Sequence, residues 1–169
     1  EFRLAAWAND SHNNQAFSLT TGQPTPTSES QYKDKTMMIG SFGETINPIE
    51  IALSAGATFI ARTYALDIEH TKEIIKEAIN HKGFSYVEIL QPCTAFHDTT
   101  GIISKNIYKI KKTDDIKEAM KKVSEYKYNL NGKIPIGIFY QKKKTTLEDQ
   151  WPQLKHLLSK KIGWWKLKK

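Results

Sequence analysis

Residues 57–93 read ATFIARTYALDIEHTKEIIKEAINHKGFSYVEILQPC, and this stretch decides the fold class. Its outer parts, 57–62 and 84–90, are short apolar runs that predict buried strands. Between them, apolar residues recur at helical spacing from Ile68 to His81, after Asp67 as the capping residue. Two apolar strands joined by a helix are typical of parallel neighbours in a covered sheet. We therefore expect an α/β fold with a mostly parallel sheet and helices on both faces.

The segments on the amino side of this stretch predict a loop and a helix. Residues 18–43 are rich in Thr, Ser, Gly, Gln and Pro without any helical or strand period, which predicts a long loop that is functional or disordered. A helix then begins at Asn47-Pro48, because Asn caps free backbone N–H groups and Pro fits the first turn. This helix ends at Gly56.

Two helices and a strand are predicted on the carboxyl side. We expect an amphipathic helix over 114–127, a strand over 133–140 and a final helix over 146–161. Pro135 makes the strand either an edge strand or an irregular one. The final helix would have one apolar face, formed by Leu147, Trp151, Leu154, Leu157 and Leu158.

Lysine gives the chain its net charge of +7, and most of the excess follows Lys105. Such a surface attracts an acidic partner, namely nucleic acid, an anionic membrane or an acidic protein, although a solvated lysine-rich surface fits equally well. No run approaches the roughly 18–20 apolar residues that a membrane span needs. Residues 1–9 lack the layout of a signal peptide. We therefore expect a cytoplasmic protein without a membrane part.

The single cysteine, Cys93, cannot form an internal disulfide or complete a metal site by itself. It follows a predicted strand at the carboxyl end, where ligands gather in parallel sheets. It is therefore either an inert buried thiol or one ligand of a site whose other ligands lie elsewhere. The five histidines show no metal-ligand spacing, and we expect His70 and His81 at the surface or at helix ends.

The string Asn13–Thr27, NNQAFSLTTGQPTPT, is the most informative about function. Paired asparagines before a Gly, Thr and Pro loop are by themselves ordinary turn residues. The whole string, however, resembles the cofactor loop of the beta subunits of 2-oxoacid:ferredoxin oxidoreductases. Four further segments resemble the same family in the same order: Asn47–Arg62, His70–Phe84, Leu90–Cys93 and Ile134–Tyr140. The resemblance implies a partial thiamine-diphosphate-binding fold, with 1–140 as the C-terminal part of that domain and 141–169 as a basic helix or tail.

The resemblance also implies a site for thiamine diphosphate held through Mg²⁺. The cofactor-binding residues that it implies are Asn13, Asn14, Ala16, Leu19, Thr20 and Thr21. The Mg²⁺ ligands would be the Asn14 side chain and the Ala16 backbone carbonyl, neutral oxygen donors that suit a hard cation facing diphosphate. The third family ligand, an Asp in Gly-Asp-Gly, is expected upstream of residue 1 and does not occur in this sequence.

Residues 8–12 depart from the family pattern, because they are polar where the family has a buried strand. We expect an altered, foreign or disordered segment there. Thr21 stands where relatives often carry lysine, which argues against a dicarboxylic oxoacid as substrate.

The resemblance assigns Cys93 to a [4Fe-4S] cluster whose other thiolates lie in an N-terminal half. The implied reaction is oxidative decarboxylation of a 2-oxoacid to acyl-CoA with ferredoxin as electron acceptor, in an enzyme completed by an alpha subunit. The lysine surplus fits docking of an acidic ferredoxin. No side chain is assigned a catalytic role, because the cofactor carries the chemistry.

Two alternatives stay open from the sequence. One is a basic nucleic-acid-binding α/β module, in which lysines are interleaved with aromatic residues that stack on bases. Those aromatic residues are Tyr126, Tyr128, Trp151, Trp164 and Trp165. The other is an inactive fragment of the thiamine-diphosphate-binding fold.

Overall fold

The centre of the protein is a mixed sheet whose strands stand in the order β1-β5-β4-β7-β6. The computed structural model describes residues 6–160, without the side chains at 6–9, 147–148, 155–156 and 158. In chain order the strands of this sheet are β1 (Ala6–Asn13), β4 (Phe59–Tyr64), β5 (Gly83–Leu90), β6 (Ile107–Lys109) and β7 (Ile134–Gln141). Of the neighbouring pairs, only β4–β7 is antiparallel, which confirms the mostly parallel sheet.

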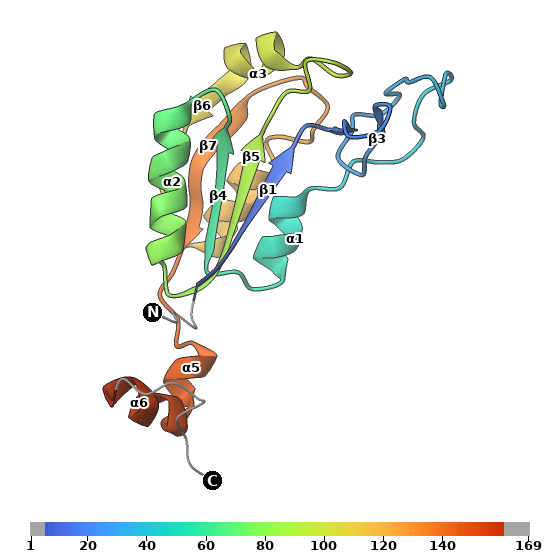
Figure 1. The fold of residues 1–169 in the computed structure, drawn as a ribbon. Helices are drawn as coiled ribbons and strands as arrows, with labels where there is room; N and C mark the ends of the chain where they lie inside the picture. The colour runs from blue at the N-terminus through green and yellow to red at the C-terminus, as the bar shows by residue number, and fades with distance from the viewer. Residues whose placement is uncertain (1–5, 161–169) are drawn as a thin grey trace.

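Helices cover both faces of the sheet, as predicted (Figure 1). On one face α2 (Ile68–Asn80) packs through Ile74 and Ala78. On the other face lie α1 (Pro48–Ser54) and α4 (Ile116–Val123). Burial of these apolar faces provides the main driving force for the layered arrangement.

Local sequence signals account for the helices next to β4. The side chain of Asn47 accepts hydrogen bonds from the backbone N–H groups of Ile49 and Glu50, at 3.2 and 3.3 Å. Asp67 caps α2 in the same way, accepting from the His70 N–H at 3.2 Å. Both caps satisfy donors that a helix start leaves unpaired. The helix–strand–helix–strand order of the central region is therefore confirmed.

The polar segment 8–12 forms a regular strand, so the disordered alternative for this segment is wrong, while its alteration relative to the family stays a prediction. It is part of β1, which pairs in parallel with β5 from Ala6 opposite Gly83 to Asn13 opposite Leu90. Among the described strands β1 pairs with β5 alone and so stands at an edge of the sheet. An edge position tolerates polar side chains, and Asp10 and His12 are exposed there.

β7 lies inside the sheet, between β4 and β6, so the edge alternative for Pro135 is wrong. The irregular alternative is confirmed. The pairing with β4 shifts register between Ile60 and Ala61, and the register with β4 reaches only to Gly137. Pro135 lies beyond that point, opposite Tyr108 of β6. Because proline has no N–H to donate, it is tolerated where one ladder has already ended.

The carboxyl third differs most from expectation. The helix predicted over 114–127 is the shorter α4, and α3 (Thr100–Asn106) and β6 were not predicted. The final helix is divided into α5 (Leu147–Gln150) and α6 (Pro152–Ser159), because Pro152 cannot continue a helix. On the predicted apolar face, Leu154 and Leu157 are buried and Trp151 is partly exposed. The side chains of Leu147 and Leu158, and the tail with Trp164 and Trp165, lie outside the described residues.

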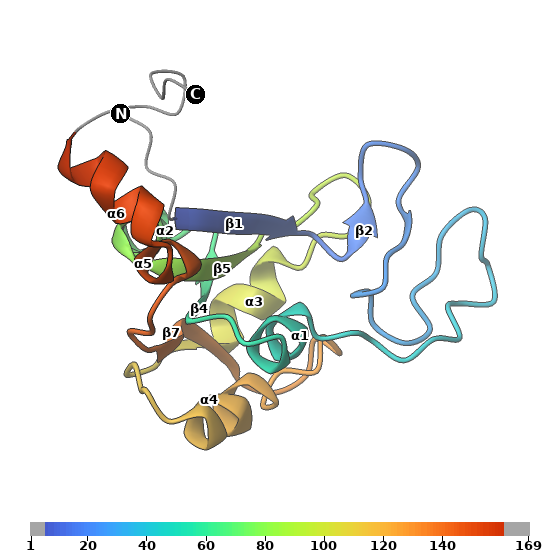
Figure 2. The same cartoon turned by 90° about the horizontal axis from the view of Figure 1, so that it is seen from below.

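The long loop predicted over 18–43 is confirmed and contains little regular structure. It follows β2 (Ala16–Phe17), which pairs with β3 (Gln23–Pro24) in a small hairpin. From there, residues 25–46 extend away from the sheet, beyond α1 (Figure 2). Three large apolar side chains on this extension are strongly exposed: Met38, Ile39 and Phe42.

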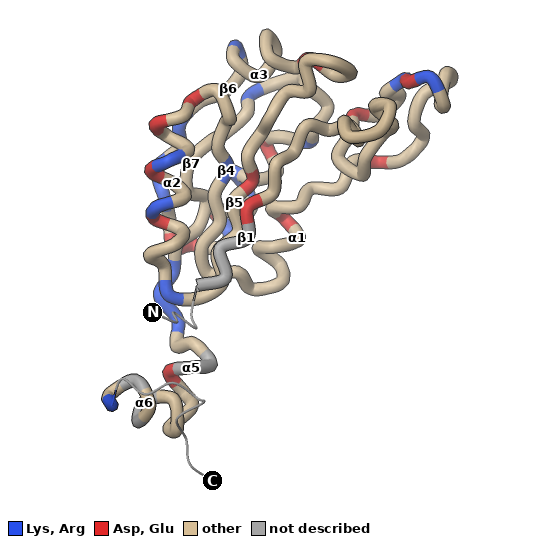
Figure 3. Tube along the Cα trace, in the orientation of Figure 1, with Lys and Arg blue, Asp and Glu red and all other residues tan. Residues whose placement is uncertain are grey.

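Charged residues concentrate on α2 and just before α5 (Figure 3). Acidic and basic residues alternate on the outer face of α2, whereas Lys142, Lys143 and Lys144 form a basic run between β7 and α5. Among residues 6–160, no helix has the length and apolar character needed to cross a bilayer.

A comparison of two glycines tests how closely the side chains pack at the first residue of β5. Gly83 has φ +128°, and a Cβ there would lie 2.3 Å from Thr58 Oγ1, which is held by His81 and by the Phe84 carbonyl. We expect Gly83→Ala to lower the free energy of unfolding by about 2–4 kcal/mol. Gly56 is the control, because it has φ +89° but open space around it. Gly56→Ala should cost only about 1 kcal/mol. Equal losses in urea denaturation would contradict this account.

Candidate functional site

Three parallel strands end on the same side of the sheet. At this carboxyl-terminal end of the sheet, β1 ends at Asn13, β4 at Tyr64 and β5 at Leu90. From β1 the chain enters residues 14–46, here called the site loop. From β5 it enters residues 91–99, here called the cysteine loop. Ligands of parallel sheets bind at the carboxyl ends of the strands, so these two loops define the candidate site.

The turn Asn13–Ala16 begins the site loop, and its two asparagine side chains fold back onto the backbone. The Asn13 Oδ1 accepts from the Gln15 N–H at 3.1 Å and from the Thr27 hydroxyl at 2.8 Å. The Asn14 Oδ1 accepts from the Ala16 N–H at 3.3 Å, while its Nδ2 donates to Ser18 at 2.8 Å. Such bonds from Asn to the backbone two residues on stabilise tight turns and fix the amide orientation.

Gln15, at the centre of this turn, has its side chain inside the protein. The residue is 2 % exposed and has φ +57°, a left-handed conformation that costs a non-glycine residue about 1 kcal/mol. Its Nε2 donates to the carbonyls of Thr27 and Tyr128, each at 2.9 Å. Its Oε1 accepts from the Tyr126 hydroxyl at 3.2 Å. These hydrogen bonds satisfy both N–H donors and one acceptor position of the buried Gln15 amide, and they anchor the turn to the protein interior.

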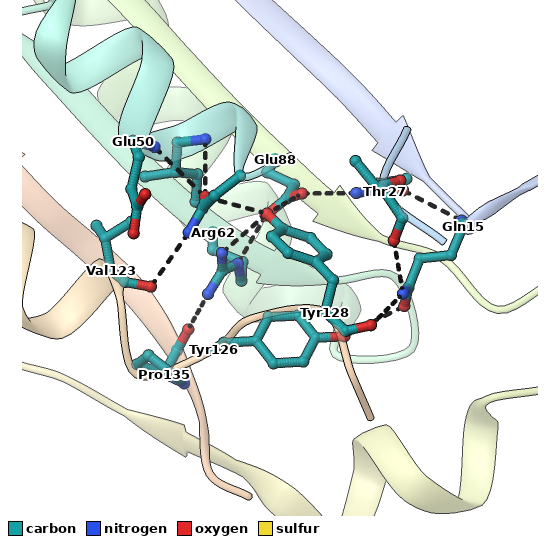
Figure 4. Close-up of polar contacts among 12 residues, drawn as sticks. Gln15, Thr27, Glu50, Arg62, Glu88, Val123, Tyr126, Tyr128 and Pro135 are labelled. Atoms are coloured by element: carbon teal, nitrogen blue, oxygen red, sulfur yellow. Dashed lines mark hydrogen bonds and ion pairs between the residues drawn. The ribbon is translucent and has the colours of Figure 1, made fainter. Parts of the chain in front are cut away.

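A buried ion pair between Arg62 of β4 and Glu88 of β5 lies beneath the turn (Figure 4). Both side chains are fully buried, and Arg62 Nε donates to Glu88 Oε2 at 2.7 Å. The guanidinium also donates to the Tyr128 hydroxyl at 3.0 Å and to the Pro135 carbonyl at 3.5 Å.

Glu88 in turn accepts from Asn13 Nδ2 at 2.8 Å and from the Tyr128 hydroxyl at 2.7 Å. The ion pair is thereby linked directly to the first residue of the turn. Its remaining polar atoms are satisfied, as a buried pair of charges requires.

The electrostatics of this network keep Arg62 charged and the two tyrosines neutral. Burial alone lowers the pKa of Arg62, but its contacts with Tyr128 and Glu88 outweigh burial and raise that pKa. Burial raises the pKa of Tyr126 and of Tyr128 well above the ordinary phenol value. Both phenols are therefore protonated at neutral pH and available as hydrogen-bond donors.

The site loop and the cysteine loop pack against each other. Gly22 has φ +80°, and a Cβ there would lie 2.7 Å from Phe96 Cβ. The Tyr32 hydroxyl donates to the Gly22 carbonyl at 2.9 Å, and the Tyr32 ring stands edge-on to His97 with centroids 4.7 Å apart. The His97 ring is in turn 3.1 Å from Glu29.

Cys93 lies within this contact and is 8 % exposed. Its backbone forms a bridge with His97, with N–O distances of 3.2 and 2.8 Å. Burial raises the pKa of the Tyr32 phenol, and Glu29, Asp34 and Cys93 add to this rise through their charges. The predicted cofactor loop and the predicted cluster cysteine are therefore neighbours.

The structure brings only some of the predicted site residues together. Asn13, Asn14 and Ala16 form the turn. Leu19, Thr20 and Thr21 lie instead at the exposed tip of the β2–β3 hairpin, where the Leu19 side chain is fully exposed. The Thr20 hydroxyl donates to the Phe17 carbonyl at 3.1 Å within this tip. Their assignment to cofactor or substrate stays a prediction.

The donor atoms of the turn fit a Mg²⁺ ion that is shared with a diphosphate. The residue opposite Ala16 in the hairpin is Pro24, which has no N–H and so cannot occupy the Ala16 carbonyl. Within the described residues, no group of three or more His, Cys, Asp or Glu side chains could hold a metal. The available donors are thus the neutral oxygens of Asn14 and Ala16, a suitable partial set for Mg²⁺.

A [4Fe-4S] cluster fits this chain only in part. Such a cluster needs four thiolates as a rule, and the sequence contains one cysteine. Cys93 can therefore supply one ligand, and its role as a ligand stays a prediction.

The sequence did not point to Gln15, Arg62 and Glu88 as residues of the site. It suggested Tyr126 and Tyr128 only as base-stacking residues, whereas both lie beneath the turn. A signal was present, because the predicted apolar strands each contain one charge of opposite sign. Parallel pairing places Arg62 directly opposite Glu88. Of the two alternatives for His70 and His81, the surface position is wrong, since both are buried, and the helix-end position is confirmed, with His70 in the first turn of α2. His81 does stand at the end of α2, where its Nε2 lies 2.8 Å from Thr58 Oγ1.

Comparison with known families agrees with this geometry. Residues 11–89 match the family described as thiamine pyrophosphate enzyme, C-terminal TPP binding domain. Residues 93–156 match the family described as the C-terminal part of the pyruvate ferredoxin oxidoreductase beta subunit. The fold thus places the chain in the class of the C-terminal domains of thiamine pyrophosphate enzymes.

Individual relatives make the assignment narrower. The chain is 39 % identical over 142 residues to a 2-oxoacid:ferredoxin oxidoreductase subunit beta from Sulfolobus sp, covering 77 % of this chain and 47 % of the relative. It is 38 % identical over 151 residues to the protein of that name from Saccharolobus solfataricus, covering 82 % and 50 %. The chain belongs to the family of 2-oxoacid:ferredoxin oxidoreductase beta subunits, and it spans about half the length of these relatives.

A solved structure shares the fold. It is the 2-oxoglutarate:ferredoxin oxidoreductase from Magnetococcus marinus with 2-oxoglutarate, coenzyme A and succinyl-CoA bound, matched with a TM-score of 0.79 at 28 % identity. The match covers 93 % of this chain and 54 % of that one. The predicted thiamine-diphosphate-binding fold is confirmed. The predicted division into 1–140 and 141–169 stays a prediction.

The ion pair beneath the turn yields a stability prediction. Arg62→Met leaves Glu88 buried without its partner and should lower the free energy of unfolding by about 3–5 kcal/mol. Lys72→Met is the matched control, because Lys72 pairs with Glu69 at 3.5 Å on the exposed face of α2. The control should change stability by less than about 1 kcal/mol. Similar losses for both variants in urea denaturation would show that the buried pair has no special role.

Proposed function

We propose that this chain forms the thiamine-diphosphate and Mg²⁺ binding part of an enzyme that oxidatively decarboxylates a 2-oxoacid to acyl-CoA, with ferredoxin as the electron acceptor. The observation that carries the proposal is the Asn13–Ala16 turn. It holds neutral oxygen donors at the carboxyl ends of parallel strands, next to the loop that contains Cys93. The family membership supports the reaction class.

Each residue of the turn has a proposed part. The Asn14 amide oxygen and the Ala16 carbonyl hold Mg²⁺, while Asn13 anchors the turn to Glu88. Leu19, Thr20 and Thr21 face the cofactor and substrate from the hairpin tip. When bound, thiamine diphosphate would supply the nucleophilic carbon that decarboxylation of a 2-oxoacid needs. The protein's own part is to grip the diphosphate and to exclude water from the site.

Partners complete the proposal. The site is completed by an alpha subunit, and ferredoxin and coenzyme A accept electrons and the acyl group in a cytoplasmic enzyme. We propose that Cys93 supplies one thiolate of a [4Fe-4S] cluster. The exposed apolar residues Leu19, Met38 and Phe42 of the site loop give a second chain a surface to cover.

The lysine surplus does not locate the ferredoxin contact. A groove between α2 and the segment before α5 is lined by lysines, among them Lys76, Lys82 and Lys143, together with the acidic residues Glu73, Glu77 and Asp149. This groove is near the amino end of β5, whereas Cys93 follows its carboxyl end. The eight residues of β5 span about 26 Å. An electron acceptor that approaches Cys93 therefore docks at the carboxyl-terminal end of the strands, opposite to this groove.

The nucleic-acid alternative loses part of its basis in the structure. Tyr126 and Tyr128 are fully buried in the network beneath the turn, so they cannot stack on bases. Trp164 and Trp165 lie outside the described residues, which leaves Trp151 as the one described aromatic residue of the set with an exposed ring. The oxidoreductase proposal accounts for both tyrosines and is preferred.

Removal of the proposed Mg²⁺ ligand tests the cofactor site. We expect Asn14→Ala to weaken Mg²⁺-dependent binding of thiamine diphosphate by about tenfold or more, measured by calorimetry on the complete gene product with its alpha subunit. Asn80→Ala at the exposed end of α2 is the control and should bind like the wild type. Unchanged binding in Asn14→Ala would remove this residue from the Mg²⁺ site.

Cys93 and the reaction itself are tested by reduction of a viologen dye with a 2-oxoacid as electron donor. The complete enzyme, purified without oxygen, should reduce the dye only when thiamine diphosphate and coenzyme A are present. Cys93→Ala should abolish this reduction and lower the iron content. Reduction that survives the substitution would remove Cys93 from the electron path. A loaded wild-type enzyme that reduces no dye with any oxoacid would support the inactive-fragment alternative.

A further inference from the structure

The Asn13–Ala16 turn is held by a segment that follows it by more than a hundred positions in the chain. The residues Tyr126, Lys127 and Tyr128, here called the clamp segment, follow α4 and contact the turn directly at Gln15. Gln15 lies between the two proposed Mg²⁺ ligands, so whatever fixes Gln15 also fixes the spacing of Asn14 and Ala16.

We propose that Tyr126 is a positioning residue for the Mg²⁺ site, whose hydroxyl acts through Gln15 to hold the Asn14 and Ala16 oxygens in the arrangement that receives the cation. This inference rests on the proposed function of the turn. It adds to that proposal a residue from outside the site loop, one that contacts neither the cation nor the cofactor.

The hydrogen bonds around Gln15 determine which way its amide points. Its Nε2 has two carbonyl partners, Thr27 and Tyr128, and carbonyls only accept. The amide nitrogen must therefore face them, which leaves Oε1 toward Tyr126. Since the Tyr126 hydroxyl stays protonated, it donates to this oxygen. The three partners together permit a single orientation of the Gln15 side chain.

Tyr126 is itself rigid. It is fully buried, its ring packs against Tyr128 with centroids 4.7 Å apart, and the Arg62 guanidinium lies 5.0 Å from the ring centroid. A cation over an aromatic face inside a protein is a fixed contact that resists ring movement. The position of the Tyr126 hydroxyl is therefore fixed, and its hydrogen bond fixes the position of the Gln15 side chain.

The left-handed backbone of Gln15 explains why the turn needs such a hold. At φ +57° the residue occupies a conformation that a free loop would leave for the more favourable negative φ region. That relaxation would change the direction of the peptide groups between Asn14 and Ala16. A turn already held in the binding conformation avoids the ordering cost that a relaxed turn would incur on binding Mg²⁺.

A hydroxyl deletion separates positioning from ordinary core packing. Tyr126→Phe removes the donor to Gln15 and keeps the ring. Tyr64→Phe is the matched control, because Tyr64 belongs to the same buried apolar cluster and its hydroxyl lies 3.0 Å from Ser104, away from the turn. Tyr126→Phe loses one hydroxyl contact, and Tyr64→Phe loses two, with Ser104 and with the Thr100 carbonyl at 3.4 Å. The melting temperature of the control should therefore fall at least as far as that of Tyr126→Phe.

The deciding readout is the Mg²⁺ concentration that gives half-maximal binding of thiamine diphosphate. It is measured by calorimetry on the complete gene product with its alpha subunit. We expect Tyr126→Phe to raise this concentration about fivefold to tenfold, the range that one lost hydrogen bond supplies. Tyr64→Phe should stay within about twofold of the wild type. Equal values for the two variants would overturn the proposal.

A double substitution tests whether the effect passes through Gln15. Gln15→Met has a similar shape but no hydrogen-bonding amide. Adding Tyr126→Phe to Gln15→Met should cause little further rise in the Mg²⁺ requirement, because the link is already broken. The full rise in that background would overturn the proposed route.

Failure of this inference is distinguishable from failure of the proposed function. A wild-type enzyme that binds no thiamine diphosphate at any Mg²⁺ concentration would refute both. A wild-type enzyme that binds it, with Tyr126→Phe unchanged, would refute only the role of Tyr126.

Discussion

The ion pair between Arg62 and Glu88 is the constraint on which the rest of the structure depends. Two charges inside a sheet are costly to bury unless every remaining donor and acceptor is satisfied. Here the partners come from three other places in the chain: Asn13 at the end of β1, the clamp segment with its aromatic rings, and the start of β7. Each of these elements has to lie within hydrogen-bonding or ring-contact distance of Arg62 or Glu88. The polar centre therefore specifies the arrangement of the strands as well as stabilising it.

The candidate site is built directly on this centre. Asn13 contacts Glu88 through its side chain, and Gln15 contacts the clamp segment, so the turn inherits the rigidity of the sheet below it. The hairpin tip and residues 38–42, by contrast, expose the apolar side chains of Leu19, Met38, Ile39 and Phe42. The site thus combines a fixed base with outer segments whose apolar side chains are exposed. Precise placement of ligands requires such a base, because loops alone position groups poorly.

Much of the fold is encoded locally and could be predicted from sequence. The helix–strand–helix–strand core follows from apolar periodicity and from the caps Asn47 and Asp67, which act over a few residues. β1 escaped prediction because its polar residues reflect an edge position, which only pairing reveals. The place of β7 escaped for the same reason, since its partners β4 and β6 are distant in sequence. For the site, the loop string identified the turn, but the roles of Gln15 and Tyr126 depend on burial and on one side-chain direction, which no local pattern encodes.

The position of β7 has a consequence for how the protein is made. A ribosome releases β4, α2 and β5 long before β7, so Arg62 can meet Glu88 early, across 26 positions of sequence. The clamp segment and the Pro135 carbonyl emerge only later. A nascent chain that has reached β5 therefore carries its charged pair with one side still open to water. The sheet closes, and the turn acquires its support, only after nearly the whole described chain has left the ribosome, so the cofactor binding that we propose for the turn comes late in synthesis.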